Sequence, residues 1–192
     1  DGLGRTVVLG DSFAEGWGVD EDKRVSNLLE QRLGREFLNF GAATHGPLQY
    51  QLVYEQLASR YAHDHVLIML LADNDFTDND FTFWQHKAGA GGRARPYYER
   101  LAGGAYRAIY PVPQRAEAAP SRTSGWLDGF GRTIRRNSWA LRTGEYIGDL
   151  LSGRTDYAGY FDATEAQLDA VVWTLGEFRR LATGERRITI AL

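Results

Sequence analysis

The chain has 192 residues, 43% of them apolar and 12% aromatic, with a formal net charge of −3 and no cysteine. This composition predicts one globular domain with a sizeable core and excludes a disordered chain. The near-balanced charge excludes a bulk electrostatic attraction to nucleic acid or to an anionic membrane, and the lack of cysteine excludes a disulfide framework and thiolate chemistry.

The first predicted strand contains the apolar run Val7-Val8-Leu9 and breaks at Gly10-Asp11-Ser12. A β-branched run that ends in glycine and small polar residues is typical of a buried strand entering a tight turn. In open parallel sheets, ligands bind beyond the carboxyl ends of the strands. Two interpretations of Ser12 follow: an exposed nucleophile, or a residue that caps the next helix.

Helices and strands alternate through the rest of the first half. A helix is predicted over Val25–Leu33, a strand over Glu36–Phe40, a helix opening at Gly46-Pro47, and a strand over Val66–Leu71. Such short units favour right-handed crossovers and a parallel sheet. The helix that opens at Pro47 has apolar residues at helical spacing, namely Tyr50, Val53, Tyr54, Leu57 and Tyr61.

The second half departs from this alternation. Residues Pro96–Tyr110 predict a β-hairpin with a glycine turn, and a helix is predicted over Trp126–Leu151. A further helix over Thr164–Ala182 begins with a capping box, and Arg187–Leu192 predicts a fourth parallel strand. The apolar stripe expected on the helix over 164–182 consists of Leu168, Val171, Val172, Leu175 and Phe178.

Three strand ends carry residue types suited to acyl transfer. Ser12 follows the first strand, Gly41 the second and Asn74 the third, and the carboxyl ends of parallel strands lie at one edge of a sheet. A serine attacks a carbonyl carbon, whereas a glycine N–H and an asparagine amide donate hydrogen bonds to the developing oxyanion. Taken singly, Gly41 and Asn74 are equally typical of turns. Their joint placement favours the catalytic interpretation.

Three segments of the sequence resemble the conserved blocks of the SGNH hydrolase (GDSL esterase/lipase) superfamily. They are Gly-Asp-Ser-Phe-Ala-Glu-Gly-Trp-Gly-Val at 10–19, Asn-Phe-Gly-Ala-Ala-Thr-His-Gly at 39–46, and Leu-Ala-Asp-Asn-Asp at 71–75. The third block has Ala72 where the family usually has glycine. The hairpin at 96–110 also resembles an insertion found in a subset of these proteins.

The resemblance implies roles for particular residues. Ser12 would be the nucleophile, and its own N–H, the Gly41 N–H and the Asn74 side chain would form the oxyanion hole. By the same resemblance, Gly10, Asp11 and Asp75 support the motifs. For Asp11, the sequence favours bracing of the turn through its side chain over a role in proton transfer.

The sequence contains no recognisable general base for Ser12. The family supplies one from an Asp-x-x-His motif near its carboxyl end, but none of the four histidines here has an aspartate three positions earlier; they are His45, His63, His65 and His86. We therefore expect the catalytic Asp and His beyond residue 192, after a fifth strand. We also expect no histidine of this chain within hydrogen-bond reach of Ser12.

Residues near the end of the third strand predict the walls of a pocket. His45, Phe76 and Trp84 are candidates for lining it, with core packing as the alternative for the aromatic residues. The aspartates between 73 and 80 indicate either a cation site or a solvated acidic loop. A helix-loop-helix calcium site needs Gly at the sixth position of its loop and Glu at the twelfth. Counted from Asp73, these positions hold Asp78 and Trp84, so the sequence favours the solvated loop. We name no metal and no cofactor.

These observations predict a three-layer α/β fold of the flavodoxin type, with parallel strand order 2-1-3-4. Residues 1–192 are expected to form one domain with a helical and hairpin insertion at 76–160. The predicted function is serine-dependent hydrolysis of a small-molecule or carbohydrate ester through an acyl-enzyme. Two alternatives stay open: an O-acyltransferase acting on a polysaccharide, and a non-catalytic carbohydrate-binding module with the same fold.

The sequence leaves localisation and oligomeric state open. The longest apolar run, Val66 to Ala72, has seven residues, whereas a membrane helix needs roughly 20. No signal peptide is visible, and the chain starts at Asp1 without a methionine, so we expect its natural beginning to be missing.

Overall fold

The computed structural model describes residues 4–72, 74–88, 94–111, 163–182 and 186–192. The helix predicted over 126–151, and with it most of the expected insertion at 76–160, lies outside these residues. The described part of that insertion consists of helix α4 (Phe81–Ala88) and the strands β4 (Tyr97–Arg100) and β5 (Tyr106–Ile109).

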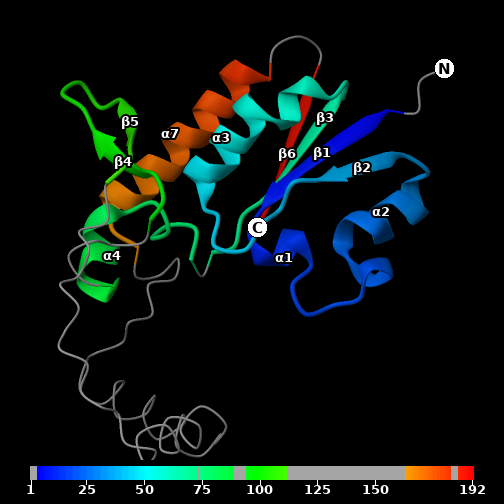
Figure 1. Cartoon of the computed structure of the whole chain (residues 1–192). Coiled ribbons are helices and arrows are strands. Elements are labelled where there is room, and N and C mark those ends of the chain that lie inside the picture. The colour runs from blue at the N-terminus through cyan, green and yellow to red at the C-terminus, as the bar shows by residue number, and fades with distance from the viewer. Residues whose placement is uncertain (1–3, 73, 89–93, 112–162, 183–185) are drawn as a thin grey trace, which may run out of the picture.

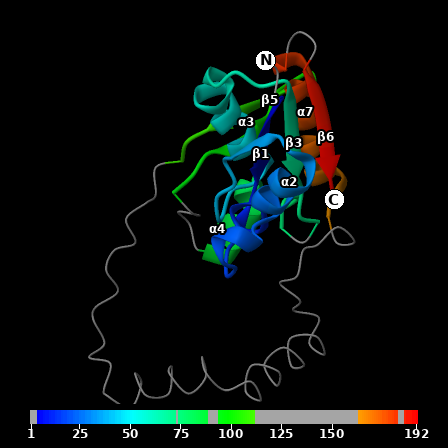
Figure 2. The same cartoon turned by 90° about the vertical axis from the view of Figure 1, so that its right-hand side faces the viewer.

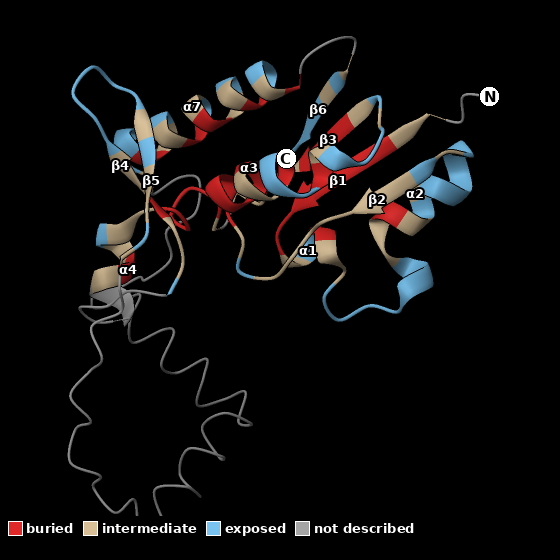
Figure 3. Ribbon diagram, turned by 45° about the horizontal axis from the view of Figure 1, so that its top comes forward, coloured by how far each residue is buried: buried red, intermediate tan, exposed pale blue. Residues whose placement is uncertain are grey.

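The main sheet has four parallel strands. They are β1 (Arg5–Gly10), β2 (Glu36–Asn39), β3 (His65–Met69) and β6 (Arg187–Ala191), and their order is β2-β1-β3-β6. This order confirms the predicted 2-1-3-4, because β6 is the fourth parallel strand of the chain. Among the described strands β6 pairs with β3 alone, and most of its residues are exposed (Figure 3).

Helices cover both faces of the sheet, which gives the predicted three-layer α/β fold. Helices α3 (Pro47–Gln56) and α7 (Glu165–Leu181) lie side by side on one face, and α1 (Ser12–Glu15) and α2 (Val25–Leu33) lie on the other (Figures 1 and 2). Residues alternate between the faces along a strand. Val7 and Leu9 accordingly pack with the α3–α7 layer, while Val8 packs with Ala14 of α1.

The local signals of the second half are confirmed where the structure describes them. Helix α7 begins with a capping box in which the Gln167 N–H donates to the Thr164 hydroxyl and the Thr164 N–H donates to the Gln167 side chain. Strands β4 and β5 pair antiparallel. Gly103 and Gly104 form their turn with φ of 98° and 87°, a conformation that favours glycine.

The apolar faces predicted for α3 and α7 each include residues that the structure leaves exposed. Helix α3 ends at Gln56, so Leu57 and Tyr61 fall outside it and are 45% and 44% exposed. Val172 is 68% exposed although it was expected on the buried stripe of α7. Val171 and Phe178 of the same predicted stripe are buried, as expected; Val172 is not, because the helix turns only one narrow face to the sheet.

No helix in the described part of the chain combines the length and the apolar character needed to cross a bilayer.

Candidate active site

Ser12 is the first residue of α1 and follows directly on β1. The residue that caps this helix is Asp11, whose Oδ1 accepts a hydrogen bond from the Phe13 N–H at 2.9 Å. Ser12 therefore does not serve as the cap, which was the plainer interpretation of its sequence context. Its side chain is half-buried, and its hydroxyl makes no hydrogen bond with another described residue.

Gly10 lets α1 lie close to the sheet. A Cβ added at Gly10 would lie 2.5 Å from the Ala14 Cβ and 3.0 Å from the Met69 carbonyl oxygen. Because no real side chain fits that space, glycine is required for α1 to start where it does. Asp11 is 2% exposed, and its second oxygen, Oδ2, is buried without a partner among the described residues.

Gly41 lies against α1. A Cβ added there would lie 2.5 Å from the Glu15 N atom and 2.7 Å from the Ala14 carbonyl carbon. The Asn39 side chain fixes this approach, because it accepts the Gly41 N–H at 2.8 Å and donates to the Ala14 carbonyl at 2.6 Å. The structure thus brings Gly41 beside the helix that begins with Ser12, and it engages the Gly41 N–H with Asn39.

Asn74 is held by its own loop. Its Nδ2 donates to Asp78 Oδ2 at 2.7 Å, and its carbonyl accepts the Asp78 N–H at 2.8 Å. The Oδ1 atom of Asn74 is buried without a partner in the described part of the chain. Among the described residues no hydrogen bond joins Asn74 to Ser12 or Gly41.

Asp75 anchors the start of this loop in the core. It is 1% exposed, its Oδ1 accepts the Tyr50 hydroxyl at 2.7 Å, and its Oδ2 accepts the Leu71 N–H at 2.8 Å. Burial raises the pKa of Asp75 to about 8; the two hydrogen bonds oppose this rise, and the neighbouring Asp11 and Asp78 carboxylates add to it. Burial likewise raises the pKa of the Tyr50 hydroxyl.

The prediction of a solvated acidic loop is wrong for two of its aspartates. Asp75 and Asp78 are 1% and 3% exposed. Asp75 is satisfied by hydrogen bonds, and Asp78 by hydrogen bonds and an ion pair inside the protein, as buried carboxyl groups require. Asp78 pairs with Arg95 at 2.9 Å, with 4% and 9% of the two side chains exposed.

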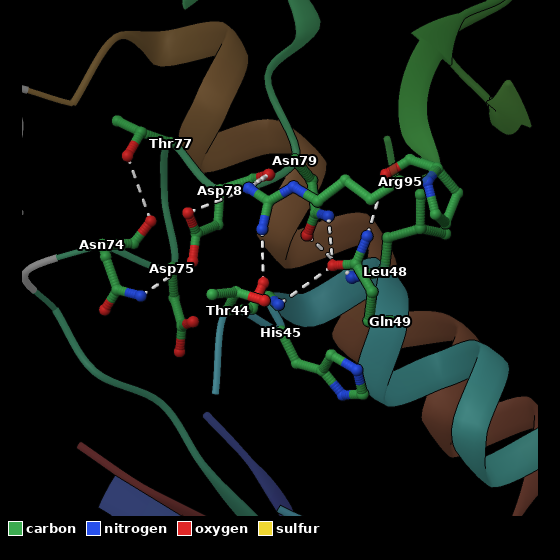
Figure 4. A network of polar contacts seen from close by, with 12 residues as sticks. Thr44, His45, Leu48, Gln49, Asn74, Asp75, Thr77, Asp78, Asn79 and Arg95 are labelled. Atoms are coloured by element: carbon green, nitrogen blue, oxygen red, sulfur yellow. Dashed lines mark hydrogen bonds and ion pairs between the residues drawn. The ribbon is translucent and has the colours of Figure 1, made fainter. Parts of the chain in front are cut away.

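Two amide side chains connect this loop to α3, as Figure 4 shows. Asn79 accepts the Leu48 N–H at 2.8 Å and donates to Gln49 at 2.7 Å. Gln49 accepts the Gly46 N–H at 2.9 Å and donates to the Pro96 carbonyl at 2.8 Å. The start of α3, the loop over 74–80 and the segment before β4 therefore form one polar junction.

The described histidines do not hydrogen bond to Ser12. His45 is half-buried, and burial lowers its pKa, as does the Arg95 charge, against an opposite effect of Glu15. His63 pairs with the Tyr54 hydroxyl and His65 with the Thr189 hydroxyl, both at the far end of the sheet from Ser12. The His86 side chain lies outside the described residues.

Two cavities adjoin the loops at this edge of the sheet. One of about 170 Å³ is bounded by Asp11, Phe13, Leu71 and Leu192, among others, beside the turn that carries Ser12. The other, of about 300 Å³, lies between the 75–82 segment, the β4–β5 hairpin and α7.

The two aromatic pocket candidates are core residues as well. Phe76 is 9% exposed, packs in the α3–α7 core and also lines the larger cavity. Trp84 is 7% exposed and lies under the Arg95 guanidinium. A role for Phe76, Trp84 or His45 in contacting substrate stays a prediction.

Sequence reasoning missed the residues that connect these loops. Arg95 and Asp78 are 17 positions apart and Asn79 and Gln49 are 30 apart, so no periodic pattern relates them. In the sequence, the strongest indication of a residue that connects loops was Asn39, which opens the second of the three blocks, residues 39–46. Its three hydrogen bonds, with Gly41, Ala14 and Ser26, explain an asparagine at that position.

No family model matches this chain, and a search of curated proteins finds no match. A search of solved structures finds a protein of the G-D-S-L lipolytic family from Desulfitobacterium hafniense DCB-2, with 21% identity and a TM-score of 0.36 over 44% of this chain and 49% of that one.

Two further solved structures are similar over a comparable region. A member of the lipolytic G-D-S-L family from Veillonella parvula DSM 2008 has 18% identity and a TM-score of 0.34, covering 43% of this chain and 47% of that chain. The α/β hydrolase LAE5 from a Lake Arreo metagenome has 15% identity and a TM-score of 0.29, covering 43% and 42%. The chain therefore spans about half the length of the structures it resembles, and these likenesses concern the fold alone.

The fold and the loops define an α/β protein with a doubly covered parallel sheet, in which three sequence blocks meet at the carboxyl edge.

Proposed function

We propose that this chain is the nucleophile-bearing part of a serine-dependent ester hydrolase. One observation carries the proposal. Ser12 lies at the carboxyl end of β1 with its hydroxyl free of the capping role, because Asp11 caps α1. A nucleophilic serine needs a hydroxyl that is free to reach a base and the substrate.

The proposed reaction begins with attack of the Ser12 Oγ on the ester carbonyl carbon. The carbonyl oxygen gains the negative charge and is stabilised by the Ser12 N–H, the Gly41 N–H and the Asn74 amide, each such donor being worth about 2.7–4 kcal/mol. The bond from the carbonyl carbon to the alcohol oxygen then breaks, which leaves an acyl-enzyme. Water attacks this intermediate, releases the carboxylic acid and restores the Ser12 hydroxyl.

The proton of Ser12 requires a base. In serine hydrolases a histidine takes it and then gives it to the leaving alcohol. Since no described histidine hydrogen bonds to Ser12, we place this base outside the described residues. The Gly41 N–H, now bound to Asn39 at 2.8 Å, would share its hydrogen between Asn39 and the oxyanion in the reacting complex.

Hydrolysis of p-nitrophenyl acetate by the intact protein tests the proposal. Ser12→Ala should lower kcat/KM by at least about 10³-fold, because loss of the nucleophile leaves only binding and oxyanion stabilisation. Ser59→Ala is the matched control: Ser59 is a half-buried serine after α3 whose hydroxyl donates to the Glu55 carbonyl. It should retain wild-type activity.

A fluorophosphonate probe gives a second measurement. Peptide mapping should find the label on Ser12 and on no other serine. Equal esterase activity of wild type and Ser12→Ala would overturn the proposal, and so would an intact protein that neither hydrolyses the ester nor takes the label.

A further inference from the structure

Arg95, two residues before β4, is a buried cation with unusual surroundings. Its side chain is 9% exposed, and its guanidinium lies over the rings of Trp84 and Tyr97, at 5.2 Å and 5.6 Å from their centroids. Removing a charge from water costs several kcal/mol unless it is well paired. The groups with which Arg95 pairs therefore indicate its role.

The guanidinium joins two of the loops at the candidate site (Figure 4). It donates to the carbonyl of Thr44, to the carbonyl of Asp78, and to Asp78 Oδ1 at 2.9 Å. Thr44 has a φ of 68°, a left-handed conformation that β-branched residues rarely adopt. One guanidinium nitrogen of Arg95 thus binds the carbonyl of Thr44, whose backbone is strained, in the loop after β2. The other nitrogen binds Asp78 in the loop over 74–80.

Asp78 passes this restraint on to Asn74. While Oδ1 of Asp78 faces Arg95, its Oδ2 accepts the Asn74 Nδ2–H at 2.7 Å. A carboxylate accepts hydrogen bonds only, so it selects the NH₂ end of the Asn74 amide and not the oxygen end. An NH₂ group has two hydrogens; with one bound to Asp78, the direction of the other is fixed.

We propose that Arg95 is a positioning residue: through Asp78 it orients the Asn74 amide so that the second N–H of that amide is available to the oxyanion. The inference rests on the proposed function, in which Asn74 is an oxyanion donor.

This role predicts a particular kinetic signature. The oxyanion forms in the transition state and not in the bound ester, so misorientation of Asn74 lowers kcat and leaves KM largely unchanged. A purely structural role of Arg95 would instead lower the fraction of folded protein or change kcat and KM together.

A double-mutant cycle in the intact protein, with p-nitrophenyl acetate as substrate, tests the inference. Asn74→Ala should lower kcat about 10²-fold, the cost of one oxyanion donor. Arg95→Met should lower kcat by roughly 10-fold or more, and Arg95→Lys, which keeps the charge, should restore part of that loss. Combining Asn74→Ala with Arg95→Met should cost no more than Asn74→Ala alone, within about 2-fold.

Arg107→Met is the matched control. Arg107 lies in the same hairpin and pairs with Glu99 on the surface, so its loss should leave kcat and KM unchanged. If Arg95→Met fails to fold, Asp78→Asn replaces it in the same cycle, because Arg95 and Asn74 donate to different oxygens of Asp78 and asparagine puts an NH₂ group in place of one of them. In ¹⁵N spectra the Asn74 side-chain NH₂ resonances should shift in Arg95→Lys and Asp78→Asn but not in Arg107→Met.

The outcomes separate this inference from the proposed function. Wild-type kcat in Asn74→Ala would mean that Asn74 is no oxyanion donor, which contradicts the proposed function itself. A strong loss in Asn74→Ala together with wild-type kcat in folded Arg95 variants would overturn the positioning role alone. Fully additive losses of Arg95 and Asn74 would overturn it as well, because the two residues would then act independently.

Discussion

The two sides of the candidate site are held together by different physical means. On the Ser12 side, α1 and residues 39–43 meet through close backbone packing, with Gly41 lying where a Cβ would be 2.5 Å from the Glu15 N atom. On the Asn74 side, the 74–80 loop is held by the buried Asp78–Arg95 ion pair and by the buried carboxyl group of Asp75, with Asp75 and Asp78 1% and 3% exposed. The Ser12 side should therefore be sensitive to added volume and the Asn74 side to changes of charge.

The largest expected effect is the loss of the Asp78 carboxylate. Asp78→Ala leaves the buried Arg95 guanidinium without its carboxylate partner, and breaking a buried pair by removing one partner costs about 3–5 kcal/mol. The free energy of unfolding from urea titration measures this. Asp169→Ala is the control, since Asp169 pairs with Arg100 at 3.4 Å and both side chains are half exposed; its removal should cost about 0–1 kcal/mol. Similar losses in the two variants would contradict the comparison.

The second effect is a pH dependence that arises from Asp75. Its pKa is about 8 in the folded protein and 3.8 ordinarily, so between these pH values the folded state keeps a proton that the unfolded chain has lost. Raising the pH therefore favours unfolding. The stability that this group contributes is complete below about pH 4 and is lost as the pH rises through 8.

Asp75→Asn isolates this effect, because it removes the titration and keeps the size of the side chain. Wild type should lose stability relative to Asp75→Asn as the pH rises from 5 to 8, by at most about 1.4 kcal/mol for each pH unit. Urea unfolding of both proteins at each pH measures the difference. Parallel pH profiles would show that Asp75 is ionised in the folded protein.

The contrast between the two sides also explains what the sequence could predict. Strand order, both layers of helices and the α7 capping box depend on local patterns: apolar runs, glycine breaks and the Thr164–Gln167 spacing. The approach of Gly41 to α1 was within reach for the same reason, because a glycine at a strand end indicates close backbone contact.

The Asn74 side was not predictable in this way. An aspartate-rich segment is normally solvated, and nothing near Asp78 in the sequence identifies Arg95 as its partner. Tyr50 was interpreted as part of an apolar helix face, which its 1% exposure confirms; that its hydroxyl would bind Asp75 depends on the tertiary arrangement of α3 and the loop. Long-range pairs of this kind carry no periodic signal.

Added volume should affect the Ser12 side. Gly41→Ala forces backbone atoms of Glu15 and Ala14 to move, and such overpacking typically costs about 1–3 kcal/mol. Gly176→Ala is the control: a Cβ there meets nothing within 4 Å in α7, and alanine in a helix is favoured over glycine by up to about 1 kcal/mol. Thermal unfolding of both variants checks the prediction. A Gly41→Ala protein as stable as Gly176→Ala would show that the loop does not depend on this close approach.

The smallest expected effect comes from removing a charge on the Ser12 side. Glu15 Oε2 accepts the Ala43 N–H at 2.7 Å and so ties α1 to the Gly41 loop. Glu15→Gln keeps an oxygen that can accept the same N–H, so it exchanges a charge-assisted hydrogen bond for a neutral one and should cost less than about 1 kcal/mol.

The corresponding exchange of a carboxylate for an amide on the Asn74 side should have a larger effect. Asp78→Asn has to satisfy two donors, Arg95 and the Asn74 amide, and asparagine has one oxygen with which to do so. One donor is left facing the new NH₂ group, so urea unfolding should show a larger loss than in Glu15→Gln. Equal losses in these two variants would mean that charge stabilises the two loops alike, and that Arg95 contributes packing without setting the orientation of Asn74.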